Sequence, residues 1–143
     1  MDNAPTESIS DRVARAKAYP FLIPASSYLF KNGEFTELPR NYRWGKNERV
    51  GVLAIGSNRS PEQLRDKYLG AHWGEIPVVK ARLDGFDVVY SAYITRRGYI
   101  PATLHVSPNT RVDVSITWLT PDQLAEMHTT EASGVIYDYC YAK

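Results

Sequence analysis

The chain has 143 residues, 43% of them hydrophobic and 23% charged, which predicts a single globular domain and excludes a largely disordered chain. A formal net charge of +1 gives no overall field that would gather nucleic acid or an anionic membrane, so we expect neither as a partner. The single cysteine, Cys140, excludes an internal disulfide, and without a signal peptide or an apolar spanning segment we expect a cytoplasmic protein.

The first 49 residues predict a short helix and then a segment that wraps the core. Residues 10–18 carry a weak helical pattern, which ends where two prolines follow. Asn32-Gly33 separates two short apolar runs and predicts a β-hairpin. We expect the rest of residues 1–49 to be an extension that wraps a domain formed by residues 50–143.

Apolar runs after residue 50 alternate with two capped helices. Strands are predicted over residues 50–55, 78–95, 100–106, 112–118 and 135–141, with a turn at Pro108-Asn109 and a kink or turn at Asp84-Gly85. Helices are predicted over 61–68 and 121–130, each opened by a capping box that begins at Ser60 or Thr120. Together these elements predict an α+β fold, a small mixed or antiparallel β-barrel with short helices packed outside it.

The turn Gly56-Ser57-Asn58 lies between a predicted strand and a predicted helix. The backbone N–H groups of such a turn, together with the helix dipole, favour an anion. Glycine permits close approach, while Ser57 and Asn58 add a hydroxyl and an amide. The alternative is an ordinary capped turn that binds nothing.

Glu131 follows the second predicted helix and precedes a glycine-containing turn. A carboxylate in this position faces the negative end of the helix dipole, which is unfavourable for its charged form. Such a group suits general acid/base chemistry. The alternative is a solvated surface glutamate.

Two other sets of residues favour structural roles. The spacing of His72, His105 and His128 matches no metal-ligand pattern, so we expect no metal and no cofactor. Residues 40–46 interleave basic and aromatic side chains, which are able to stack on single-stranded nucleic acid. Aromatic side chains packed onto the barrel are the favoured interpretation of this segment.

Four motifs follow one another over residues 50–141, namely VLAIGSNRSPEQL, LDGFDVVYSAY, PATLHVSP and VDVSITWLTPDQLAEMHTTE, before a later tyrosine. In this order they resemble the gamma-glutamylcyclotransferase-like family. In that family a strand ends in Tyr-Gly-Ser-Asn before a Ser-Pro-Glu-Leu-type helix, and a Leu-Asp-x-x-Glu-Gly motif comes later. The resemblance implies a small β-barrel with flanking helices and no metal.

The resemblance also implies an enzyme of C–N lyase or acyl-transfer type. Its substrate would be a small gamma-glutamyl compound, cyclised to 5-oxoproline with release of an amine or amino acid. Glu131 would be the general acid/base that moves a proton from the attacking α-amine to the leaving amine. The substrate-binding residues that the resemblance implies are Ile55, Gly56, Ser57, Asn58 and Tyr137.

The chain departs from the family motifs at three positions. Ile55 replaces the loop tyrosine, His128 replaces the aspartate before the glutamate, and Ala132 replaces the glycine after it. Several family members also continue past the position of Lys143, so either this chain is a shortened form or residues 1–49 supply the missing part.

These departures keep two other hypotheses open. One is a non-catalytic domain of the same fold that binds a small carboxylate, and the other is a nucleic-acid interaction module that uses residues 40–46. The oligomeric state also stays open, with a homodimer as one alternative.

Overall fold

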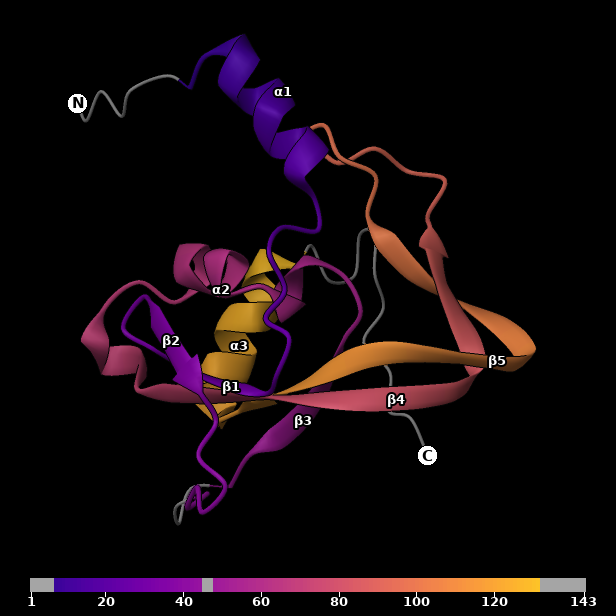
Figure 1. Cartoon of the computed structure of the whole chain (residues 1–143). Coiled ribbons are helices and arrows are strands. Elements are labelled where there is room, and N and C mark those ends of the chain that lie inside the picture. Colours follow the sequence, from indigo (N-terminus) through magenta and orange to yellow (C-terminus); the bar gives the residue numbers. More distant parts are fainter. Residues whose placement is uncertain (1–6, 45–47, 132–143) are drawn as a thin grey trace.

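The computed structural model describes residues 7–44 and 48–131. They form an α+β fold in which five strands make one sheet, in the order β2-β1-β4-β5-β3 (Figure 1). Helices α2 and α3 lie together on one face of this sheet, whereas α1 lies beside the connection between β4 and β5. The elements are α1 (Ile9–Ala18), β1 (Tyr28–Lys31), β2 (Glu34–Glu37), β3 (Val50–Ala54), the 3-10 turn η1 (Ser57–Arg59), α2 (Pro61–Lys67), the 3-10 turn η2 (Ala71–Trp73), β4 (Glu75–Tyr90), β5 (Ala102–Leu119) and α3 (Pro121–Thr130).

A long bent hairpin of β4 and β5 forms the centre of the sheet. The register between the two strands shifts where Gly85, at a φ of +79°, lies opposite residues 107–110 of β5. Both strands bend together on the right of Figure 1. The Ser107 and Thr110 hydroxyls lie 2.6 Å apart across the bulged segment, so its polar groups are paired locally.

The predicted turn at Pro108-Asn109 is therefore wrong as a reversal of the chain. The strands predicted over 100–106 and 112–118 are parts of one strand, β5, because the extra residues form a bulge and pairing with β4 resumes after it. The kink predicted at Asp84-Gly85 is confirmed, and β4 ends at Tyr90 rather than at residue 95.

The hairpin predicted at Asn32-Gly33 is confirmed. Both residues have positive φ values, +49° and +81°, as a tight two-residue hairpin turn requires. β1 pairs with β2 on one side and with β4 on the other, always antiparallel. Residues 28–37 therefore belong to the same sheet as β3, β4 and β5, while the domain boundary at residue 50 stays a prediction.

The described sheet is open, and its edges are β2 and β3. All its pairings are antiparallel, so the described strands form neither a mixed sheet nor a closed barrel. The strand predicted over residues 135–141 lies outside the described residues. Closure of the sheet into a barrel therefore stays a prediction.

The core lies between the sheet and the helix pair α2 and α3. The hydroxyl of Tyr68, the C-cap residue of α2, donates to the Gln123 carbonyl oxygen of α3 over 2.8 Å, which joins the two helices. Eight buried side chains make up the cluster: Tyr28, Phe30, Leu64, Tyr68, Ile76, Val78, Leu119 and Met127. Helix α3 is thereby fixed over the sheet, and its C-cap residue Glu131 contacts the loop that follows β3.

The three predicted helices are confirmed as α1, α2 and α3, but only α3 has the complete capping box predicted for both α2 and α3. Thr120 and Gln123 form the reciprocal capping box at the start of α3. At α2 the Ser60 hydroxyl accepts a hydrogen bond from the Glu62 N–H over 3.3 Å. The Gln63 side-chain oxygen does not return the contact and, among the described residues, has no hydrogen-bond partner. Gln63 instead lines a cavity.

Candidate functional site

The Gly56-Ser57-Asn58 loop and Glu131 line the same cavity, which has a volume of about 650 Å³. The loop follows β3, and Glu131 is the C-cap residue of α3. Asn58 Nδ2 donates to Glu131 Oε1 over 2.9 Å, although 73 residues separate the two along the chain. The two segments from which the sequence predicts a site therefore meet in space.

Glu131 is held by a buried cation that the sequence interpretation missed. Lys67 Nζ contacts Glu131 Oε1, the oxygen that also accepts from Asn58. The Lys67 side chain is 5% exposed and that of Glu131 36%. Burial lowers the pKa of Lys67, and the Glu131 carboxylate opposes that shift.

Among the described residues, donors contact only one oxygen of this carboxylate. Within residues 7–44 and 48–131, no donor contacts Glu131 Oε2. The same side chain therefore combines a fixed oxygen with one that a ligand in the cavity is able to reach. The helix dipole disfavours a negative charge at this helix end, and Lys67 supplies the compensating positive charge.

Two amide oxygens near the loop lack donors. Asn58 Oδ1 and Gln63 Oε1 are buried and, in the described part of the chain, have no hydrogen-bond partner. The whole Gln63 side chain is nearly buried, and it lies one helical turn before Lys67 on α2. A buried acceptor without a donor costs free energy, and both oxygens are too buried for a ligand in the cavity to supply that donor unless the side chains move.

Tyr19 fixes the conformation of the loop from the other side. Its hydroxyl oxygen accepts from the Ala102 N–H over 2.7 Å, and a Cβ at Gly56 would collide with it. Burial raises the pKa of Tyr19, while the N–H groups of Ala102 and Ser57 oppose that rise. Position 56 therefore requires glycine for space, and Tyr19 carried no signal for this role in the sequence.

The predicted anion site was expected to use backbone N–H groups of the loop and the helix dipole, whereas the structure places cationic side chains there. Ser57 and Asn58 of the loop form part of the 3-10 turn η1, which precedes α2, and the Ser60 hydroxyl occupies one N–H at the start of that helix. Arg96 and Arg97, in the β4–β5 connection, line the cavity together with the buried Lys67. Positive charge at this site therefore comes from side chains of α2 and this connection, because the helix end itself is displaced from the loop.

The predicted site residues fall into two groups. Ile55, Gly56, Ser57 and Asn58 line the cavity together with Glu131. Tyr137 lies outside the described residues, as do Ala132 and Cys140. An isoleucine at position 55 gives the cavity wall an apolar side chain without a hydroxyl.

The described part of the basic and aromatic segment packs against the sheet. The Trp44 ring lies 5.5 Å from the Trp118 ring and 5.3 Å from that of Tyr42, and the Tyr42 hydroxyl donates to Glu75 over 3.2 Å. These contacts favour the packed interpretation of residues 40–44. In the chain as described, no three His, Cys, Asp or Glu side chains gather in a way that would hold a metal ion.

Comparison with known proteins gives no relative. No protein-family model, no curated protein and no solved structure matches this chain. The resemblance to the gamma-glutamylcyclotransferase-like family therefore depends on the motifs alone. Over residues 7–44 and 48–131, no helix is long and apolar enough to cross a membrane.

Proposed function

We propose that the Glu131 cavity binds a small gamma-glutamyl compound and converts it to 5-oxoproline, releasing an amine or an amino acid. The observation that carries the proposal is the hydrogen bond from Asn58 to Glu131, which joins the two motif segments at one cavity. A barrel of the gamma-glutamylcyclotransferase-like type is part of the same proposal, with the strand predicted over residues 135–141 adding to the open sheet.

The chemistry needs one group that accepts and then returns a proton. The α-ammonium of the substrate gives a proton to the Glu131 carboxylate, and the freed amine attacks the γ-carbonyl carbon. The bond from that carbon to the leaving nitrogen breaks as Glu131 returns the proton to that nitrogen. The released amine takes up the second proton that the ring nitrogen loses, and so it leaves as an ammonium. Glu131 Oε2 suits this role because the described part of the chain places donors on Oε1 alone.

The charges of the cavity match the rest of such a substrate. A gamma-glutamyl group carries an α-carboxylate and an α-ammonium. Arg96 and Arg97 are suited to hold the carboxylate, since a guanidinium group pairs with it through two N–H donors. The Glu131 carboxylate is the acceptor suited to the ammonium.

The test is to incubate the protein with a panel of gamma-glutamyl amino acids and amines and to measure 5-oxoproline. We expect turnover by the unchanged chain and a loss of at least about 100-fold in Glu131→Gln, because a positioned acid/base contributes about that much or more. Glu126→Gln is the matched control, since it makes the same change on the same helix at a residue that does not line the cavity. Undiminished turnover by a folded Glu131→Gln protein would contradict the assigned role.

A second candidate function is binding of a small carboxylate without turnover. It is favoured by the contact of Lys67 with Glu131, which ties the proposed acid/base into an ion pair, and by Ile55, which has no hydroxyl. Calorimetry with glutamate and 5-oxoproline would then show saturable binding while the panel yields no product. Product formation would exclude this candidate.

A further inference from the structure

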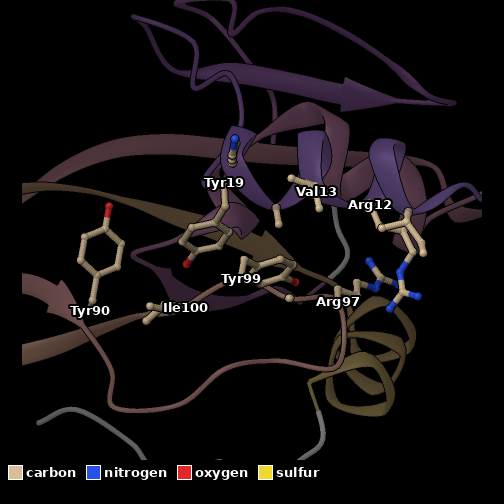
Figure 2. Close-up of a pocket in the computed structure, with 11 residues that line it drawn as sticks. Arg12, Val13, Tyr19, Tyr90, Arg97, Tyr99 and Ile100 are labelled. Atoms are coloured by element: carbon tan, nitrogen blue, oxygen red, sulfur yellow. The ribbon is translucent and has the colours of Figure 1, made fainter.

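A second cavity, of about 750 Å³, lies between α1 and the connection of β4 to β5. Val13 of α1 forms one wall, and Tyr90 and Ile100 lie across from it (Figure 2). The rings of Tyr19 and Tyr99 stack with their centroids 4.7 Å apart and also line the Glu131 cavity. The stacked pair is therefore a wall that the two cavities share, and we call the second cavity the α1 groove.

The apolar walls of the α1 groove are left uncovered. Helix α1 has no buried residue, and Val13 is 47% exposed. On the facing wall Ile100 is 43% exposed and Tyr90 is 72% exposed. An amphipathic helix is normally stabilised by covering its apolar side, and contiguous exposed apolar surface on a monomer marks a binding site.

One end of the α1 groove is cationic. The guanidinium groups of Arg12 and Arg97 point toward the same place in Figure 2. Within the described residues neither forms an ion pair, whereas the neighbouring Arg15 pairs with Asp66. Glu7 lies on the adjoining surface and is likewise unpaired in the described chain. Two guanidinium groups that converge and form no ion pair in the described chain make a site that is suited to an anion.

We propose that the α1 groove binds a small amphipathic carboxylate, with its apolar body over the Tyr19–Tyr99 pair and its carboxylate between Arg12 and Arg97. The volume lies in the range of small-molecule sites, about 300–1,000 Å³. The charge complementarity selects an acid over a neutral molecule of the same shape. This site shares Arg97 and the Tyr19–Tyr99 wall with the Glu131 cavity, but Glu131 itself plays no part in it.

The test compares octanoate with octan-1-ol, which share an apolar chain and differ in the charged group. Binding to the full chain is measured by calorimetry and located by NMR through the methyl groups of Val13 and Ile100. We expect saturable binding that shifts both methyl signals, with octanoate bound about tenfold more tightly because it gains charge-assisted hydrogen bonds. Equal affinities for the two ligands, or no shift at these methyl groups, would overturn the proposal.

Substitutions of arginines inside and outside the α1 groove show whether octanoate binds at this site or responds only to the overall charge of the protein. Arg12→Gln and Arg97→Gln should each reduce octanoate affinity several-fold and leave octan-1-ol binding unchanged. Arg82→Gln is the control, since this exposed arginine pairs with Asp113 away from the groove, and it should change neither affinity. An equal loss in this control would overturn the assignment of the anion site.

Two further measurements distinguish other outcomes. The Glu131→Gln variant should bind octanoate like the unchanged chain, so failure of the enzymatic proposal leaves this one standing. Val13→Glu, at an exposed position of α1, should weaken octanoate binding by placing a like charge in the groove. Sedimentation that shows a dimer with the Val13 and Ile100 methyl groups at its interface would identify a second copy of the chain as the occupant and overturn the ligand proposal.

Discussion

The contact between Lys67 and Glu131 predicts an asymmetry between the two substitutions that break it. Glu131→Gln removes the charge that compensates an ammonium on a side chain that is only 5% exposed. Lys67→Met leaves a carboxylate that is 36% exposed and still accepts from Asn58. Water therefore stabilises the remaining charge in the second case but not in the first.

The magnitudes follow from this difference in burial. Breaking a fully buried pair costs about 3–5 kcal/mol. The partly exposed glutamate and the amide that replaces it reduce this to about 2–3 kcal/mol for Glu131→Gln. For Lys67→Met we expect a loss below about 1 kcal/mol, because methionine packs well against the Met127 thioether and no ammonium remains to be desolvated.

The dependence on pH has a definite sign. Burial holds the pKa of Lys67 below its ordinary value of 10.5, and removing the Glu131 carboxylate removes an opposing effect. Between the folded and unfolded pKa values of Lys67 the unfolded chain binds more protons, so stability rises with pH in that window. The loss caused by Glu131→Gln should therefore shrink as the pH approaches 10.5.

The free energy of unfolding of each variant is measured by urea titration followed by tryptophan fluorescence. The third variant is the double substitution Lys67→Met/Glu131→Gln. The double variant should be more stable than Glu131→Gln alone, since it removes the uncompensated ammonium. The reasoning is refuted if Lys67→Met costs as much as Glu131→Gln, or if the double variant shows the sum of the two losses.

Three further predictions concern other positions. Gly56→Ala should cost about 1–3 kcal/mol, because its Cβ collides with the Tyr19 hydroxyl, and Tyr19→Phe in the same chain should recover part of that loss in thermal unfolding. Burial raises the pKa of Tyr28 and Tyr68, so above pH 10 these two hydroxyls ionise only in the unfolded chain. The free energy of unfolding should therefore fall as the pH rises above 10, and unchanged stability there would contradict this. Gly85→Val should destabilise the β4–β5 bend by about 1–2 kcal/mol, since valine is strained at a φ of +79°, whereas Gly85→Asn should cost less in the same urea titration.

Elements with local signals could be predicted from the sequence. The capping box at Thr120 depends on residues three apart, and the Asn32-Gly33 turn depends on two neighbours that tolerate positive φ. The pairing of the Gly56 loop with Glu131 came from the order of motifs, and the structure places both at one cavity.

Features that depend on distant contacts could not be predicted. Pro108 suggested a chain reversal, but the bulge around it leaves proline outside the regular ladder while β4 continues on the other side. Lys67 resembles any solvated helical lysine until α3 brings Glu131 over it. Tyr19 follows α1, and only the fold carries its hydroxyl to Ala102 and Gly56.

The edge strand β2 limits how two copies of this chain can associate. All four of its residues are exposed, and glutamates occupy both ends, at positions 34 and 37. If two such edges joined antiparallel about a two-fold axis through the strand centre, Glu34 of each copy would face Glu37 of the other. Like charges directly opposite each other destabilise a strand pair, so the sheet is protected against growth through this edge.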